Sequence, residues 1–487
     1  MARGIAVLGS ASDVGKSVVA AGLCRLLSDA GLVVAPFKAQ NMANQAGVTP
    51  EGREMPRAQI LQARAAGVPP EVDMGPVLLK PVTSSSAQIV VLGEAIGQRE
   101  AGDYFRDTTE LREIALGALD RLAARFDVIV IEGAGSPVEL NLLSRDFANL
   151  VPARRLGAFI MLVVDIDKGG VFAQAKGTLD LLPEEDRARV VGIVVNRFRG
   201  DRSLFEDGVR LLEQTCGVPV LSVVPYVDHG LDEEDRPLRI PVDEPVRAGK
   251  LHVGAVLSPR VANTEDLFPL LAEPDVQLTW LTRNDLIRQQ DLVILPGSKA
   301  TIGDLAFHAS TGMAESVVAA HARGAWVLGL CGGYQMLGTD LRDDAGTEGG
   351  PRAWPGLGLL PVTTVFGPQK ITGTHAFRSE WPEAGHVLTG YEIHHGRTAG
   401  GGRAVFAEGG ADVGVWGERV VGAYLHGLFA SDGWRAAFLN QVRRDRARLE
   451  LPVTRGDTLE LRIRRWASHL RASFRPGAWE RVLAAVS

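Results

Sequence analysis

One stretch, residues 326–338, constrains the fold of this chain more than any other. It opens with an apolar run over residues 326–330 that predicts a buried parallel strand, and a segment compatible with a helix follows. Between the two stands Cys331, with glycines at 329, 332 and 333. Glycines around a nucleophile permit a sharp turn from strand to helix, because larger side chains would clash there. We therefore predict that the turn presents Cys331 as a nucleophile and surrounds its thiol with backbone N–H groups.

Length, composition and charge limit the number of domains, the kinds of molecule that the protein binds and its cellular compartment. The length of 487 residues predicts roughly two to four domains, and 46% hydrophobic residues can fill their cores. A net charge of −6 without a basic block argues against nucleic acid and anionic membranes. No apolar run approaches the ~20 residues of a membrane span, and no signal peptide precedes the first predicted strand. Three widely spaced cysteines, Cys24, Cys216 and Cys331, predict neither disulfides nor a zinc site and favour the cytoplasm.

A phosphate-binding loop follows the first apolar strand, residues 4–8. The loop is Gly-Ser-Ala-Ser-Asp-Val-Gly-Lys-Ser over residues 9–17, one residue longer than the standard spacing, and helical spacing follows it. Backbone N–H groups of such a loop bind phosphate oxygens, the lysine reaches the β- and γ-phosphates, and the serine hydroxyl binds Mg²⁺. The predicted nucleotide-binding residues of this loop are Gly9, Asp13, Gly15, Lys16 and Ser17.

Three further strands end in polar residues that could reach the same nucleotide. Open α/β sheets bind ligands at the carboxyl ends of their strands. Lys38 follows the strand over residues 32–37 and could neutralise the transferring phosphoryl group; the alternative is a surface lysine. Glu132 ends a hydrophobic strand before Gly-Ala-Gly, which is the arrangement of an acid that binds Mg²⁺. Asn196 stands where phosphate-loop folds often recognise adenine, although an asparagine there is often only a turn former.

The second half of the chain supplies candidates for an acyl-transfer site. A thiol nucleophile needs a base, and His426 follows an apolar strand and precedes a glycine. The fallback bases are His394 and His395, which otherwise line the pocket or pack. Glycine turns near Gly297 and Gly332 could supply N–H groups to an oxyanion.

Strands alternate with helices, which predicts two doubly wound, mostly parallel α/β domains. We expect a nucleotide-binding domain over residues 1–235, a charged, proline-bearing linker over 236–249, and the cysteine-bearing domain over 250–445. Residues 446–487 are rich in arginine and have helical spacing, which predicts a C-terminal helical cap.

These motifs together resemble known families. Gly-Leu-Cys-Gly-Gly-Tyr-Gln at 329–335, with His426, resembles class I glutamine amidotransferases, and the N-terminal half resembles ATP-dependent synthetases of the dethiobiotin synthetase type. Their fusion in this order is similar to the cobyric acid synthase family of cobalamin biosynthesis. The motifs that resemble this family are Pro-Phe-Lys-Ala-Gln-Asn-Met at 36–42, Val-Leu-Leu-Lys-Pro at 77–81, Glu-Gly-Ala-Gly-Ser-Pro at 132–137 and Asp-Ile-Asp-Lys-Gly-Gly at 165–170.

The resemblance implies an activity and its substrates. It implies that ATP, with Mg²⁺ at Ser17 and Glu132, activates four peripheral carboxylates (b, d, e and g) of adenosylcobyrinic acid a,c-diamide, and that ammonia from glutamine converts them to amides. The ammonia would be released at Cys331 and travel by a shielded path. Small molecules are then the partners, and a homo-oligomer is compatible with the resemblance. Most class I amidotransferases carry an acid two residues after the histidine, where this chain has Leu428, so a carboxylate partner for His426 is elsewhere or absent.

Three alternatives stand beside this interpretation. The sister family, the cobyrinic acid a,c-diamide synthases, is disfavoured by Gln-Asn-Met at 40–42. Another ATP-dependent glutamine amidotransferase would share both sites and differ in its substrate loops. A ParA/MinD-like ATPase switch with a C-terminal binding module would leave Cys331 and His426 without a role.

Overall fold

The chain folds into two compact units, which are described separately. The computed structural model describes residues 2–81, 86–100, 102, 108–231, 240–348, 352–454 and 458–486. The first unit comprises Met1–Pro237 together with Thr458–Ser487, and the second comprises Leu238–Asp457. Each unit is built on a largely parallel sheet with helices on both faces, as the alternation of strands and helices predicts.

The central sheet of the first unit is parallel throughout its described strands. Alternate residues of its strands enter different cores, because successive side chains point to opposite faces. In β1, Ala6 and Leu8 pack into one core, whereas Ile5 and Val7 pack into the other. The strands, in their order across the sheet, are β12 (Val220–Pro225), β11 (Val190–Phe198), β10 (Phe159–Asp165), β1 (Arg3–Gly9), β9 (Val128–Glu132) and β2 (Val34–Phe37).

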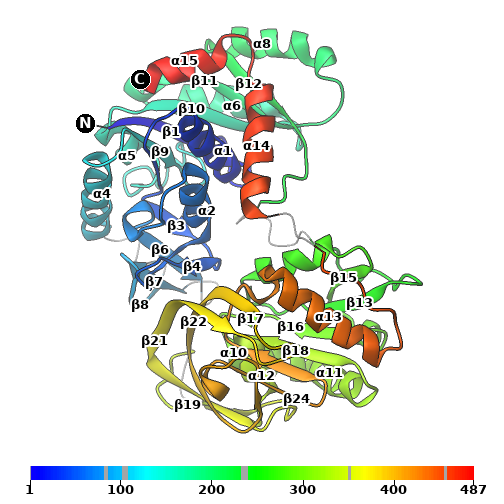
Figure 1. Ribbon diagram of the computed structural model, residues 1–487. Coiled ribbons are helices and arrows are strands. Elements are labelled where there is room, and N and C mark those ends of the chain that lie inside the picture. The colour runs from blue at the N-terminus through cyan, green and yellow to red at the C-terminus, as the bar shows by residue number, and fades with distance from the viewer. Residues whose placement is uncertain are drawn as a thin grey trace. The chain divides into compact units, whose positions relative to one another are not determined.

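Helices cover both faces of this sheet (Figure 1). One face carries α4 (Thr109–Ala123), α5 (Leu150–Arg155), α6 (Val171–Leu181) and α8 (Glu206–Cys216). The other carries α1 (Lys16–Asp29), α14 (Leu459–Ser473) and α15 (Ala478–Val486). The remaining helical segments are α2 (Arg57–Ala66), α7 (Glu184–Arg187), η1 (Val72–Met74) and η2 (Arg202–Phe205).

Smaller sheets follow β2 in the first unit. In one, β3 pairs with β6 in parallel, and β6, β7 and β8 pair antiparallel. In the other, β4 pairs antiparallel with β5. The strands are β3 (Gln40–Met42), β4 (Ala46–Val48), β5 (Glu54–Pro56), β6 (Val77–Pro81), β7 (Ser86–Val91) and β8 (Glu94–Glu100).

The second unit also has a parallel sheet, but its last two strands in the sheet order run antiparallel to their neighbours. The strands in order are β15 (Val276–Leu281), β13 (Leu251–Val256), β16 (Leu292–Leu295), β18 (Trp326–Leu330), β25 (Val420–Ala423), β24 (Gly414–Gly417) and β23 (Arg403–Ala404). The helical segments are η3 (Thr264–Ala272), α9 (Asn284–Ile287), α10 (Thr301–Ser310), α11 (Met313–Ala322), α12 (Gly332–Leu337), η4 (Gly410–Asp412), η5 (Leu428–Ala430) and α13 (Asp432–Asp445).

A long antiparallel ribbon in the second unit was not anticipated from the sequence. It pairs β21 with β22, and β19 and β20 extend the same sheet. The predicted fallback bases, His394 and His395, lie on β22. The bounds are β19 (Asp340–Asp343), β20 (Arg352–Pro355), β21 (Val362–Arg378) and β22 (Val387–Gly400), and a short pair is formed by β14 (Val261–Ala262) and β17 (Gly297–Ser298).

The linker differs from its prediction. Residues 236–239 lie outside the described residues, and the rest of the predicted linker packs along β15 in the second unit. There, Val242 bridges to Trp280, and the N–H of Arg247 donates to Gln277 Oε1 at 2.7 Å. These contacts place residues 240–247 in the second unit.

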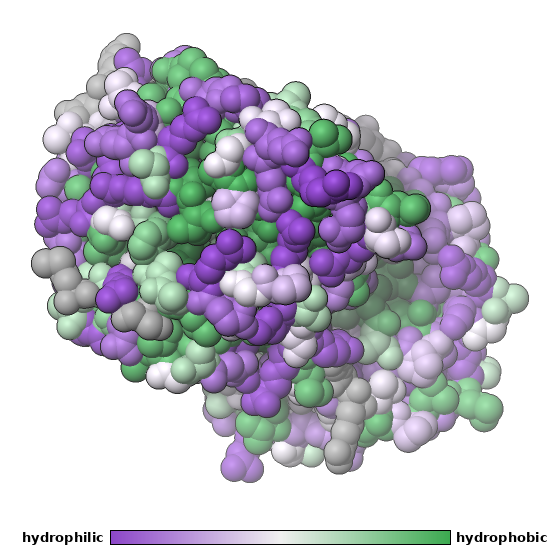
Figure 2. Space-filling model, turned by 90° about the horizontal axis from the view of Figure 1, so that it is seen from above, coloured by the Kyte–Doolittle hydropathy of each residue, from purple (hydrophilic) through white to green (hydrophobic). Residues whose placement is uncertain are grey.

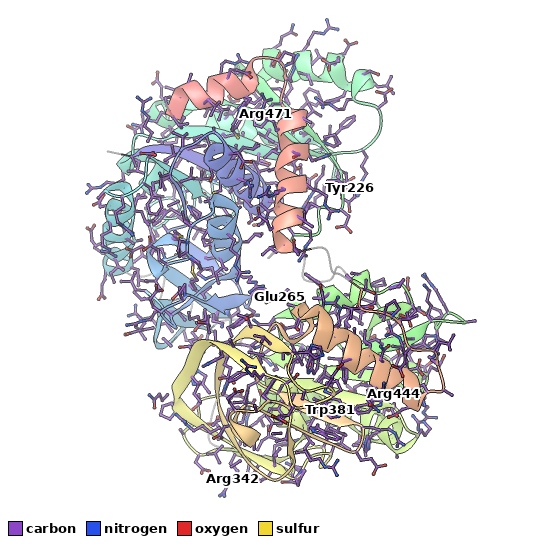
Figure 3. The ribbon with its side chains drawn as sticks, in the orientation of Figure 1. Tyr226, Glu265, Arg342, Trp381, Arg444 and Arg471 are labelled. Atoms are coloured by element: carbon purple, nitrogen blue, oxygen red, sulfur yellow. The ribbon has the colours of Figure 1, made fainter. Side chains whose placement is uncertain are left out.

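The C-terminal segment also differs from its prediction. Residues 446–454 remain with the second unit, whereas α14 and α15 complete the first. The indole Nε1 of Trp466 donates to the carbonyl of Val18 in α1 at 2.6 Å. Arg471 of α14, labelled in Figure 3, lies over the ring of Trp479 in α15. The helices therefore form part of a core and are not an independent cap.

No helix among the described residues is long and apolar enough to span a bilayer. Figure 2 shows one face of the molecule, on which hydrophilic and hydrophobic side chains are mixed. Such mixing is usual on protein surfaces.

We predict that Leu470→Ala lowers the free energy of unfolding of the first unit by about 2–5 kcal/mol, because it leaves a cavity between α14 and α1. Leu470 is fully buried in the core that contains α1. Chemical denaturation of the full chain measures the change. The matched control is Leu461→Ala on the same helix, where the side chain is 52% exposed and the expected change is within about 0.5 kcal/mol. Equal effects of the two substitutions would contradict the packing assigned to α14.

Candidate functional site

The predicted sharp turn is present at Cys331. Its backbone has φ 51° and ψ −107°, between the end of β18 and the start of α12. A positive φ is strained for a residue with a side chain, and such strain is typical of functional positions. A Cβ added at Gly333 would lie 1.9 Å from the carbonyl oxygen of Leu295, so only glycine fits there. The turn is fixed from the neighbouring strand, because the Cys331 N–H donates to the carbonyl of Ala423 at 2.8 Å.

The glycines predicted to bind an oxyanion lie beside the same thiol. A Cβ added at Gly332 would be 2.8 Å from the backbone nitrogen of Ser298, and one at Gly297 would be 3.5 Å from Cε1 of His426. The segment after β16 and the start of α12 therefore meet next to the His426 ring. N–H groups in the first turn of a helix have no acceptor within that helix, which leaves them available to a ligand.

His426 is fixed by a carboxylate that the sequence analysis did not identify. Its Nδ1 lies 2.7 Å from Oδ2 of Asp266, and Oδ1 of the same carboxylate accepts from the N–H of Gly427 at 2.7 Å. The His426 ring also stacks on Tyr391, with ring centroids 4.9 Å apart. Its Nε2 is buried without a hydrogen-bond partner among the described residues. Asp266 thus sets the orientation and tautomer of the ring and leaves Nε2 for chemistry.

The electrostatics of this site favour an imidazolium. Burial alone would lower the pKa of His426, but the negative charges of Asp266 and Cys331 outweigh it and raise the pKa well above its ordinary value. The opposite holds at His394, where burial lowers the pKa to about 4. The ring of His394 stacks on Tyr424 at 3.7 Å, and its Nδ1 lies 2.7 Å from the Gly396 carbonyl. A base for the thiol must hold the proton that it takes, and the raised pKa of His426 allows this whereas the lowered pKa of His394 does not, so His426 is favoured as the base.

The expected carboxylate partner of His426 therefore lies elsewhere in the sequence. Asp266 is on η3, 160 residues before His426, and Leu428, at the usual position of the acid, is fully buried in the core. Glu265, next to Asp266, is labelled in Figure 3 and accepts a hydrogen bond from the hydroxyl of Tyr391 at 3.1 Å. One feature of the sequence points to Asp266. The acidic pair Glu265–Asp266 follows β13, and ligand sites form at the carboxyl ends of parallel strands.

The second predicted site is centred on a buried carboxylate. Glu132 is fully buried at the end of β9, and its Oε1 lies 2.7 Å from both the hydroxyl of Ser17 and the ammonium of Lys38. Gln62 donates to Oε2. Burial alone would raise the pKa of Glu132, but the charge of Lys38 and the donated hydrogen bonds outweigh it and lower the pKa. Lys38 is itself buried, which excludes the alternative of a surface lysine.

The loop residues converge around the same strand ends. The Lys16 ammonium donates to the carbonyls of Ala11 at 2.9 Å and Gly135 at 3.0 Å, which connects the loop with the segment after β9. Gly15 has φ 92° and begins α1, and a Cβ on Gly9 would lie 2.7 Å from Val14. Both glycines are therefore required by the path of the loop.

Asn196 and Asp13 contact other parts of the site. Nδ2 of Asn196 donates to the carbonyl of Val14 at 2.9 Å, which favours a role in positioning the loop. The carboxylate of Asp13 lies 3.0 Å from Arg197 and 3.1 Å from Lys168. Arg197 also pairs with Asp165 at 2.9 Å. The ends of β10 and β11 thus hold the loop through charged contacts.

The residues of this site fit Mg²⁺. The Ser17 hydroxyl and the Glu132 carboxylate place two oxygen atoms 2.7 Å apart, and oxygen is the ligand that Mg²⁺ prefers. No group of three or more His, Cys, Asp or Glu residues suited to a metal occurs in the described part of the chain.

The fold and the two sites define a class: a phosphate-loop nucleotide-binding unit joined to a cysteine–histidine amidotransferase unit. Residues 5–238 match the CobQ/CobB/MinD/ParA nucleotide binding domain, and residues 252–434 match the CobB/CobQ-like glutamine amidotransferase domain.

Curated relatives narrow this class to one family. A cobyric acid synthase of Chlorobaculum tepidum is 50% identical over 408 residues, covering 81% of this chain and 79% of that protein. One of Chlorobium phaeobacteroides (strain BS1) is 45% identical over 488 residues, covering 96% of this chain and 97% of that protein. One of Synechococcus sp. is 42% identical over 503 residues, covering 99% of each. The chain belongs to the cobyric acid synthase family. It is a glutamine-hydrolysing, ATP-dependent amidating ligase of cobalamin synthesis.

We predict that Asp266→Asn lowers the kcat of glutamine hydrolysis by about 10²- to 10⁴-fold, because it disturbs the tautomer and charge of His426. The imidazolium must donate a proton, so activity is lost as pH rises through the His426 pKa. The carboxylate of Asp266 raises that pKa, so its removal moves the alkaline limb of the kcat profile to lower pH. Glutamate release measured from pH 6 to about 10 tests this. Asp285→Asn, at an exposed acid in the same unit, is the control. An unmoved alkaline limb would refute the role of Asp266.

Proposed function

We propose that this protein amidates the b, d, e and g carboxylates of adenosylcobyrinic acid a,c-diamide to give adenosylcobyric acid. The observation that carries the proposal is one chain with two sites, Cys331–His426–Asp266 and Lys38–Glu132–Ser17, similar over nearly its full length to proteins named cobyric acid synthase. The corrinoid, glutamine and ATP are its small-molecule substrates. The free thiols of Cys24, Cys216 and Cys331 support a cytoplasmic location.

In the first reaction, the Cys331 thiolate attacks the carboxamide carbon of glutamine. The oxyanion that forms is held by N–H groups near Gly297 and Gly332. Nε2 of His426 donates its proton to the departing nitrogen, the C–N bond breaks, and ammonia leaves a glutamyl thioester. Water, deprotonated by His426, then hydrolyses the thioester to glutamate and restores the thiol. The Asp266 carboxylate stabilises the imidazolium at both stages.

In the second reaction, a carboxylate of the corrinoid attacks the γ-phosphorus of ATP and releases ADP. The ammonium groups of Lys16 and Lys38 neutralise charge that develops on the transferring phosphoryl group. Ser17 and Glu132 would hold Mg²⁺, which supplies further neutralisation of phosphate charge when bound. Ammonia attacks the acyl phosphate, inorganic phosphate leaves, and an amide remains. Glu132 fixes the ammonium of Lys38 and the hydroxyl of Ser17 for this reaction.

We expect mass spectrometry to show successive replacement of OH by NH₂ on adenosylcobyrinic acid a,c-diamide, ending at four conversions, with enzyme, ATP, Mg²⁺ and glutamine. Cys331→Ala should abolish the reaction with glutamine and retain it with ammonium salts, because only the nucleophile is lost. Cobyrinic acid serves as the comparison acceptor. Amidation of cobyrinic acid with no reaction of the a,c-diamide would contradict the proposal in favour of the sister activity.

We predict that Glu132→Gln lowers amidation by about 10²-fold or more with either glutamine or ammonia, because it leaves the Lys38 ammonium buried without its counter-charge. ADP release and amide formation are the measurements. Alkylation of Cys331 by iodoacetamide should be unchanged, since that thiol lies in the other unit. Glu139→Gln, at an exposed acid after the same strand, is the control. Full amidation by the Glu132→Gln variant would contradict the role of Glu132 in the second reaction.

A further inference from the structure

One buried carboxylate beside the cysteine site has no role in the mechanism above. Glu392 lies on β22 and is 6% exposed. The carbonyl of the next residue, Ile393, lies 3.8 Å from Sγ of Cys331. Alternate residues of a strand share a face, so Glu392 shares its face with Gly390 and Gly396. A Cβ on Gly390 would lie 2.0 Å from the His426 carbonyl oxygen, and one on Gly396 would lie 2.4 Å from Nε2 of Gln335.

This face of β22 therefore crosses the site from His426 to Gln335, and Glu392 lies between the two contacts. Gln335 is buried one turn after Cys331 on α12, where its side chain bonds to Thr301 and Tyr424. The backbone of β22 thus passes close to the nucleophile at Ile393, and none of the steps assigned to Cys331, His426 and Asp266 requires the Glu392 carboxylate.

The hydrogen bonding of Glu392 is incomplete. Oε2 lies 3.3 Å from Nε2 of His375, whereas Oε1 is buried without a hydrogen-bond partner among the described residues. Burial raises the pKa of Glu392 to about 7, although the charge of His426 acts to lower it. A buried acceptor without a donor is costly, and such a group in a native protein calls for a partner, which can be a water, an ion or a ligand. A cationic donor would give Oε1 a hydrogen-bond partner and would also offset the cost of burying the carboxylate charge.

We propose that Glu392 binds the α-ammonium group of glutamine and thereby selects the free amino acid. The assignment rests on the proposed function, since it concerns the substrate of the Cys331 reaction. When the carboxamide of glutamine lies at Cys331, its one cationic group, the α-ammonium, is separated from Cys331 by the length of the glutamine side chain. Oε1 of Glu392, buried on the strand that passes Cys331, is the acceptor that we assign to this group, and a charge-assisted hydrogen bond is stronger than a neutral one. Glutamine within a peptide has a neutral α-nitrogen and would not satisfy Glu392.

The test compares Glu392→Gln with the wild-type full chain on two substrates. One is L-glutamine, and the other is glutaramate, which has the same carboxamide and carboxylate but hydrogen in place of the α-ammonium. We expect kcat/KM for glutamine to fall by about 10- to 100-fold, mostly through KM, which is the range for loss of a charged hydrogen bond. For glutaramate, kcat/KM should change by less than about 2-fold. The preference for glutamine would then be largely lost.

Controls separate recognition from folding and from catalysis. Glu383→Gln is matched, because that acid lies 3.4 Å from His386 in the same unit but is 70% exposed; it should retain the preference. Alkylation of Cys331 by iodoacetamide, which has no α-ammonium, should proceed at the wild-type rate in Glu392→Gln. Glu392→Asp, which keeps the charge, should retain part of the preference and supplies a second variant if the glutamine variant does not fold.

Equal losses on glutamine and glutaramate would overturn the assignment, because Glu392 would then act through the catalytic pair or the fold. An unchanged preference in Glu392→Gln would also overturn it. If the wild-type protein hydrolyses neither substrate, the proposed function itself fails, and the assignment fails with it.

Discussion

A parallel sheet brings the carboxyl ends of all its strands to one edge, and both sites of this chain are built on that constraint. In the first unit, β1, β2 and β9 end at the phosphate-binding loop, Lys38 and Glu132 respectively. In the second, β18 ends at Cys331, and His426 stands just beyond β25, its neighbour in the sheet. Residues far apart in the sequence meet because the order of strands in the sheet, and not the local sequence, determines which strand ends are neighbours.

Each site also depends on a buried charge held by a specific opposite charge. Glu132 remains a carboxylate because Lys38, Ser17 and Gln62 bond to it, and His426 favours its charged form because Asp266 lies against Nδ1. Removing one member of such a pair leaves the other buried and uncompensated, which costs more than the pair itself contributes to stability. The pairs therefore position reactive groups and do not serve mainly to stabilise the fold.

The parts of this arrangement that local pattern encodes could be predicted from the sequence. The turn at Cys331, the phosphate-binding loop and the acid at the end of β9 each combine strand, glycine and functional residue within a few positions. Asp266 could not be found in this way, since its partner is 160 residues away and the usual position holds Leu428. The ribbon of β21 and β22 was missed because its burial alternates only in part and its pairing is shifted between Phe366 and Ile371. The sequence also could not predict against which unit α14 packs, because an amphipathic helix does not specify which sheet it covers.

The return of the C-terminal helices to the first unit has a consequence for biosynthesis. Trp466, Leu470 and Trp479 belong to the same core as Val18 and Leu23, yet the whole second unit is encoded between them. On the ribosome, the amidotransferase unit emerges complete while the nucleotide-binding unit still lacks one part of its core. The core of the unit whose translation begins first can therefore be completed only after the whole second unit has been translated.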